Sequence, residues 1–82
     1  MNDGQKLFST YDLNLSAALV AHGFSLAEVH KSEGGKAQFQ FEQSEKLTAL
    51  IDRYWQGKVR MNPQTLFTSI KSIKNRLYSN YS

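Results

Sequence analysis

The chain has 82 residues, of which 40% are hydrophobic and 21% charged, and its formal net charge is +3; these values favour one small globular domain over a disordered segment. It contains no cysteine, which excludes disulfides and thiolate ligands, and its two histidines, His22 and His30, have no second ligand at metal spacing, so we expect no metal and no cofactor. The first residues lack a basic segment followed by an apolar run, so we expect no signal peptide, and no apolar stretch is long enough to cross a bilayer. We therefore expect a cytoplasmic protein without membrane attachment.

The first two predicted elements are a strand and a helix. Residues 7–11, LFSTY, have the β-branched and aromatic composition of a short strand. Thr10 or Asp12 then caps a helix, because either side chain can accept a hydrogen bond from a free amide of the first turn. Gly23 is expected to end that helix, since glycine enters the left-handed closing conformation without strain.

This helix is apolar on more than one face, with Leu15 and Leu19 opposite its other apolar residues. Such a helix is normally buried between two layers. If Leu15 and Leu19 were exposed instead, they would form a docking surface for an apolar partner or a second copy of the chain.

A β-hairpin is predicted next. Residues 24–30, FSLAEVH, suggest a strand whose alternation is disturbed near Ala27, and the turn at residues 32–35 contains two glycines. Residues 37–42, AQFQFE, alternate strictly, so Phe39 and Phe41 face one way and the strand is buried on one side only.

Two more helices follow. Ser44 is expected to cap the first of them and Gly57 to end it, while residues 58–61 form either a very short edge strand or an extended link. Asn62 then caps the last helix and Pro63 starts it, where a missing amide hydrogen costs nothing.

The predicted fold class is therefore α+β, with a small sheet packed against three helices in the order β-α-β-β-α-(β)-α. We expect residues 1–82 to form a single domain with flexible ends at about 1–6 and 79–82.

Charge is distributed unevenly along the chain. Residues 1–57 carry five basic and seven acidic side chains, a net of −2, whereas residues 58–82 carry five basic side chains and no acidic one, a net of +5. Such a split indicates a polyanionic partner, although a solvated helix face that lacks acidic residues would give the same charge distribution along the sequence. The basic residues of the second part are Lys58, Arg60, Lys71, Lys74 and Arg76.

Beside its predicted core stripe, the last helix carries a second row made of Phe67, Lys71, Lys74 and Tyr78. Aromatic rings can stack on bases, and lysines beside them can neutralise phosphates. The alternative is that the two rings widen the core stripe and the lysines extend past it into water. The same choice holds for Trp55, which is either a core residue or an anchor for a partner.

Four runs of the sequence resemble a family of short bacterial and phage-associated proteins described only as a domain of unknown function. They contain a Thr-x-Asp-Leu helix start, a Phe-x-Phe strand, a Tyr-Trp-x-Gly helix end and a closing Lys-x-Arg-Leu-Tyr, and they cover most of residues 8–78. The resemblance implies a compact α+β domain, often carried on mobile elements, and supplies no catalytic or binding residues.

We find no spacing typical of a catalytic site, so the chain is not expected to be an enzyme. The favoured function is a non-catalytic nucleic-acid-binding accessory module of a phage or mobile element, acting on DNA or RNA. Its phosphate contacts would come from the five basic residues of the second part, and its stacking side chains from Phe67, Tyr78 or Trp55. The alternative is a protein-binding inhibitor or adaptor, anti-CRISPR-like for example, or a homodimeric interaction module.

Overall fold

The computed structural model describes residues 6–81 and confirms the predicted α+β class. The order of its elements is β-α-β-β-α-α, and residues 58–61 are a link rather than a strand. Of the ends expected to be flexible, residues 1–5 and 82 lie outside the described residues. The elements are β1 (Leu7–Thr10), α1 (Leu13–Ala21), β2 (Leu26–Lys31), β3 (Ala37–Glu42), α2 (Glu45–Trp55) and α3 (Pro63–Tyr81).

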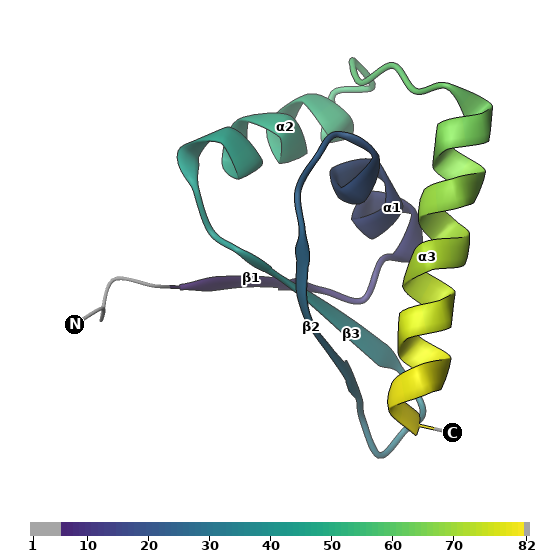
Figure 1. The fold of residues 1–82 in the computed structure, drawn as a ribbon. Helices are drawn as coiled ribbons and strands as arrows, with labels where there is room; N and C mark the ends of the chain where they lie inside the picture. The colour runs from purple at the N-terminus through teal and green to yellow at the C-terminus, as the bar shows by residue number, and fades with distance from the viewer. Residues whose placement is uncertain (1–5, 82) are drawn as a thin grey trace.

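The three strands form an antiparallel sheet in the order β1-β3-β2, with β3 in the centre (Figure 1). Phe8 of β1 lies opposite Phe41, and Val29 of β2 lies opposite Phe39, so these four side chains share one face of the sheet. The register of β2 shifts beside Ala27, which confirms the disturbed alternation seen in the sequence.

The strand predicted over residues 24–30 begins two residues later, at Leu26. The backbone amide of Phe24 donates to the carbonyl oxygen of Leu19 at 3.0 Å, so Phe24 still belongs to the turn that closes α1. Gly23 makes this turn at φ 100°, as its position in the sequence predicts.

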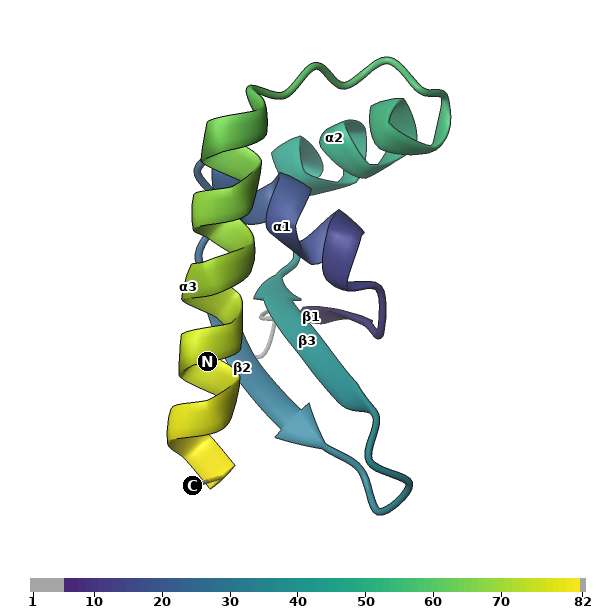
Figure 2. The same cartoon turned by 90° about the vertical axis from the view of Figure 1, so that its right-hand side faces the viewer.

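All three helices cover the same face of the sheet, and α1 lies between α2 and α3 (Figures 1 and 2). Because α1 is enclosed by the sheet and by both other helices, residues 15–19 are all buried. The prediction of a helix buried on more than one face is thus confirmed.

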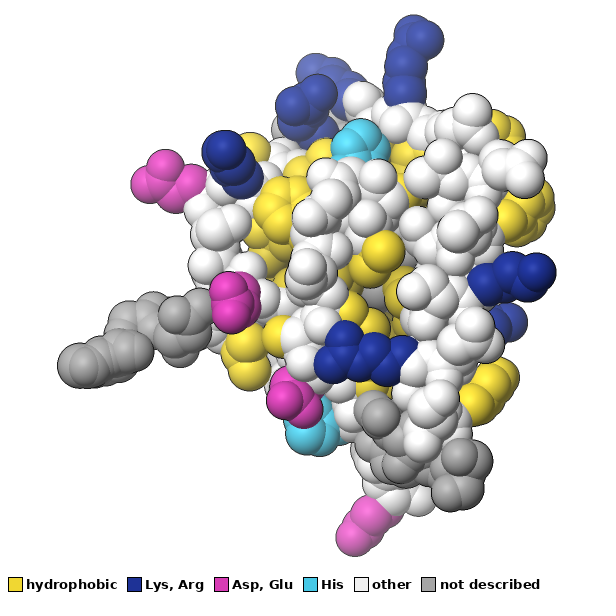
Figure 3. Space-filling model, viewed as in Figure 1, with side chains coloured by type: hydrophobic (Ala, Val, Ile, Leu, Met, Phe, Trp, Pro, Cys, Tyr) yellow, Lys and Arg dark blue, Asp and Glu magenta, His cyan; other side chains and the backbone are white. Residues whose placement is uncertain are grey.

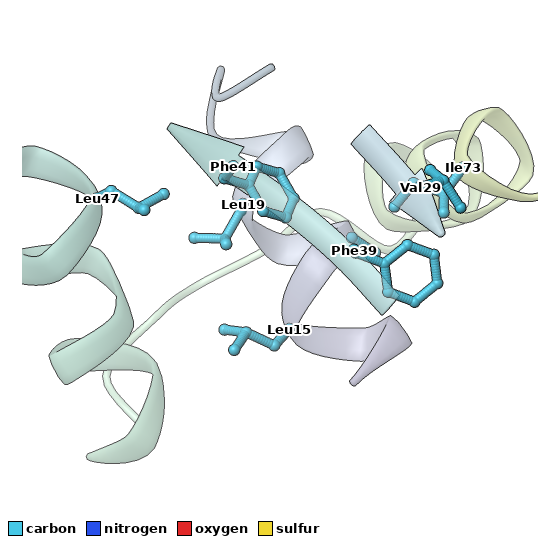
Figure 4. Packing of buried hydrophobic residues seen from close by; sticks show 8 residues of the cluster. Leu15, Leu19, Val29, Phe39, Phe41, Leu47 and Ile73 are labelled. Carbon is cyan, nitrogen blue, oxygen red and sulfur yellow. The ribbon is translucent and has the colours of Figure 1, made fainter. Parts of the chain in front are cut away.

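The core fills the space between the sheet and the helices (Figure 4). Phe41 of β3 and Leu47 of α2 point toward Leu19 of α1, while Ile73 of α3 meets Val29 of β2. The larger buried side chains are Leu15, Leu19, Val29, Phe39, Phe41, Leu47 and Ile73.

The opposite face of the sheet is open and polar. Glu28 and His30 of β2 lie on it, and the Nε2 atom of His30 is 3.8 Å from a carboxylate oxygen of Glu28. Gln40 of β3 donates to the hydroxyl oxygen of Ser9 at 3.1 Å on the same face. This face therefore offers polar and acidic groups where a stacking platform would need aromatic rings.

Each helix begins at a side-chain cap, as the sequence predicts. The capping oxygens of Asp12, Ser44 and Asn62 accept bonds from first-turn amides at 3.1, 3.1 and 2.8 Å. Asp12 rather than Thr10 caps α1, and Gly57 closes α2 at φ 74°.

Candidate nucleic-acid interface

Helix α3 uses one narrow stripe to hold itself against the rest of the protein. Leu66, Ile70 and Leu77 are half-buried on this stripe, and Ile73 is buried. These residues recur at the helical spacing and therefore lie on one face of α3. Because this face packs against the protein, the neighbouring flank of α3 points toward solvent.

That flank carries the aromatic and basic row found in the sequence. Phe67 is 66% exposed and Tyr78 is 62% exposed, so neither ring widens the core. Lys71 and Lys74 lie between them along the helix and are also exposed. We call these four residues the α3 row.

The two lysines of the α3 row have no ion-pair partner in the part of the chain that the structure describes, because no carboxylate there lies within ion-pair distance of Lys71 or Lys74. Within residues 6–81, their positive charges are therefore available to an anionic ligand.

Arg76 lies on the other flank of α3 and is occupied there. Its guanidinium donates to the carbonyl oxygen of Leu26 and, at 2.7 Å, to that of Ala27, at the irregularity of β2. Residues two apart on a helix point about 200° away from each other, so Arg76 cannot share a flank with Lys74. Two of its N–H groups are thus taken up by β2, away from the α3 row.

The remaining candidates form a separate patch at the end of α2. Trp55 is 64% exposed, and its ring meets that of Tyr54 edge to face at a centroid distance of 5.0 Å. Lys58 and Arg60 are exposed on the link that follows, while Val59 between them is half-buried. We call Trp55, Lys58 and Arg60 the α2-end patch.

The structure does not bring all eight candidate residues into one site. The link runs from the end of α2 across the molecule to the start of α3, which separates the α2-end patch from the α3 row (Figure 2). The candidates therefore fall into three places, namely the α3 row, the α2-end patch and the contact of Arg76 with β2.

On the face shown in Figure 3, basic and acidic side chains are unevenly distributed. Lys and Arg side chains lie around α2 and the link and along the outer edge of α3, whereas acidic side chains lie on the other side of this view, from the start of α2 to the hairpin. Along the outer edge of α3, basic side chains lie between hydrophobic ones. A polyanion would thus meet its most favourable potential on the α3 side.

The apolar docking surface considered for α1 is not present. Leu15 is 1% exposed and Leu19 is 0% exposed, so both are covered within one copy of the chain. An apolar partner or a dimer seated on this helix would have no surface to contact.

One aromatic–basic pair was missed by sequence reasoning. The amino group of Lys36, after the hairpin turn, lies 5.8 Å from the ring centre of Tyr11, which follows β1. These residues are far apart in the chain and carry no shared motif, so only the pairing of β1 with β3 could have revealed their contact.

The hydroxyl of Tyr54, beside Trp55, has a raised pKa. Its burial raises the pKa of its hydroxyl above the usual value of 10.0, and the negative charge of Asp12 raises it further. Tyr54 is therefore neutral at physiological pH and acts as a packing residue beside Trp55.

The described residues contain no group of three or more potential metal ligands, and none of their helices is long and apolar enough to cross a membrane. A hollow of about 410 Å³ lies beside Arg76 and is lined by Phe24 and Leu26 among others. The charged group in its described lining is the guanidinium of Arg76, which already donates hydrogen bonds to β2.

Comparison with known proteins gives a family but no activity. A family model described as "Domain of unknown function (DUF5659)" matches residues 5–79, which is nearly the whole chain. No curated protein and no solved structure has significant similarity to it.

Proposed function

Because the chain belongs to the DUF5659 family, whose description states no function, we propose a function from its surface: a non-catalytic module that binds nucleic acid through the α3 row. The proposed setting is the cytoplasm of a bacterium, where the module would serve a phage or mobile element, as the sequence resemblance implies.

The observation that carries this proposal is that Lys71 and Lys74, which have no ion-pair partner among residues 6–81, lie between two exposed aromatic rings. Lys71 and Lys74 lie on one flank of a helix that the core stripe holds in place, so the backbone that carries them is positioned before a ligand arrives. Lysine side chains bind phosphates by releasing condensed counterions, and aromatic rings add stacking.

The buried leucines of α1 also support this choice. An exposed Leu15 and Leu19 would have favoured an apolar partner, but both are covered while the α3 row is open.

The test is a fluorescence-anisotropy titration with short labelled DNA and RNA, single- and double-stranded, at low and moderate salt. The double variant Lys71→Glu/Lys74→Glu is expected to lose at least tenfold in affinity. The matched control is Lys6→Glu/Lys46→Glu, because both double variants change the net charge from +3 to −1, but the control pair lies outside the α3 row.

Absence of binding to every probe at low salt would refute the proposal. Equal losses in the two double variants would also count against it, since only net charge would then matter. Circular dichroism of each variant confirms that the fold is retained.

A second candidate function, a protein-binding inhibitor or adaptor, is favoured by the α2-end patch. An exposed Trp beside Lys and Arg has the composition of an interface anchor. Trp55→Ala would abolish such a complex while leaving nucleic-acid affinity unchanged, and a pull-down compared with the anisotropy titration separates the two functions.

A further inference from the structure

The order of residues within the α3 row suggests the form of its ligand. Phe67 and Tyr78 are eleven positions apart on one helix, which places them about 16 Å apart along the axis. Lys71 and Lys74 lie between them on the same flank. The row therefore has an aromatic ring at each end and positive charge in the middle.

Both rings leave their faces available. Phe67 and Tyr78 are each more than 60% exposed, and neither stacks on another ring or cation among the described residues. A base can stack on such a ring only when its own face is free, and the bases of a duplex already stack on one another. Stacking on this row thus requires unpaired bases.

A second copy of the chain is a poor occupant of the row. If two α3 helices met through it in antiparallel fashion, Phe67 would face Tyr78 of the other copy, and Lys71 would face its Lys74. Four lysine charges would then be forced together between the rings, and like charges brought close in an interface are unfavourable. Parallel pairing brings the same lysines together. The row instead complements a chain that carries negative charge between two flat apolar groups.

We propose, building on the function proposed above, that the α3 row binds single-stranded nucleic acid in preference to duplex. Phe67 and Tyr78 stack on two unpaired bases, and Lys71 and Lys74 neutralise the phosphates between those bases. The ligand segment is a few nucleotides long, because it spans the distance between the rings.

The number of lysines sets an expected salt dependence. Two phosphate contacts on a single strand give a slope of about −1.4 for the logarithm of affinity against the logarithm of salt concentration, whereas contacts from all five C-terminal basic residues would give about −3.5. The shallower slope follows from the structure, because Arg76 is held by β2 and the α2-end patch lies elsewhere.

The experiment compares three labelled DNA probes of equal length by anisotropy: a single strand, a duplex and an abasic single strand that keeps the phosphates but has no bases. The variants are Phe67→Leu and Tyr78→Leu, which keep an apolar side chain but remove the ring. The control is Tyr11→Leu, because Tyr11 is 57% exposed and lies outside the α3 row.

Each row variant is expected to weaken binding to the normal single strand about tenfold. The abasic strand should bind the unaltered protein more weakly than the normal strand, and the two variants should cause it no further loss. Tyr11→Leu should leave all affinities unchanged.

Duplex binding as tight as single-strand binding, or row variants that keep full single-strand affinity, would overturn this inference while leaving the proposed nucleic-acid function standing. Failure of all three DNA probes, and of the matching RNA probes, to bind at low salt would instead refute the proposed function itself.

Discussion

The contact between Arg76 and β2 leads to a prediction that separates a structural role from a binding role. Replacing Arg76 with methionine removes the two hydrogen bonds to the carbonyl oxygens of Leu26 and Ala27 but keeps an unbranched side chain. The matched variant is Lys74→Met, on the same helix and also exposed, whose amino group has no ion-pair partner among the described residues.

The expected cost of Arg76→Met follows from the geometry. A typical protein hydrogen bond stabilises by about 1 kcal/mol net, and the exposure of Arg76 removes most of the extra stabilisation that its charge would add in the interior. We therefore expect the free energy of unfolding to fall by about 1–2 kcal/mol, which in a domain of this size lowers the melting temperature by roughly 5–10 °C. Lys74→Met should change stability by less than about 0.5 kcal/mol.

Two assays on the same preparations test this reasoning. Urea denaturation gives the free energy of unfolding, and the m-value should be unchanged because the same surface is exposed on unfolding. Anisotropy with a single strand gives the affinity, which Lys74→Met should reduce and Arg76→Met should leave nearly unchanged. An Arg76→Met protein that is as stable as the original but binds less well would show that Arg76 contacts the ligand, contrary to the structure.

Leu19→Ala should destabilise the fold by about 2–5 kcal/mol in the same denaturation assay, because it leaves a cavity at a fully buried position; a loss below about 1 kcal/mol would mean that α1 is not enclosed. Gly57→Ala should cost about 1 kcal/mol through its positive φ alone, since no atom lies within 4 Å of the added methyl group, whereas Gly34→Ala, without a positive φ, serves as the neutral control. The raised pKa of Tyr54 means that the folded protein holds this proton more tightly, so the associated stability is present below the unfolded pKa, near 10.0, and is lost as the pH rises through the folded pKa. Asp12→Asn should lower that pKa, as measured by ultraviolet titration, and an unchanged titration would show that the charge of Asp12 is not felt.

The elements of this fold could be predicted because their signals are local. Asp12, Ser44 and Asn62 each cap a helix within three residues of their own position, and the alternation of Phe39 and Phe41 fixes which face of β3 is buried. Such signals need no knowledge of where distant segments lie.

The arrangement of the candidate site could be predicted only in part. The α3 row follows from helical spacing alone, because its four residues lie on a single helix. The role of Arg76 depends on α3 returning to a strand fifty residues earlier in the chain, and no local pattern encodes that return. The two-residue spacing of Lys74 and Arg76 places them on different flanks, but the prediction assigned both to phosphate contacts.

The exposure of the Phe67 and Tyr78 rings likewise could not be predicted from the pattern of residue types along the helix. Phe67 and Tyr78 would have widened the core stripe if another element had packed against their side of α3. They are exposed because the elements that α3 contacts, α1 and β2, lie against the core stripe instead. How many faces of an amphipathic helix are covered by other elements is a property of the whole fold.

The uneven distribution of charge affects how fast a ligand can be captured. On the face shown in Figure 3, acidic side chains lie from the start of α2 to the hairpin and basic side chains lie along the outer edge of α3, so an approaching polyanion is attracted more strongly on the α3 side. A polyanion that first meets the acidic side would exert a torque on the protein that turns α3 toward the polyanion. Removing negative charge from the sheet, as in Glu28→Gln, should therefore leave the bound contacts intact while the fraction of productively oriented collisions falls.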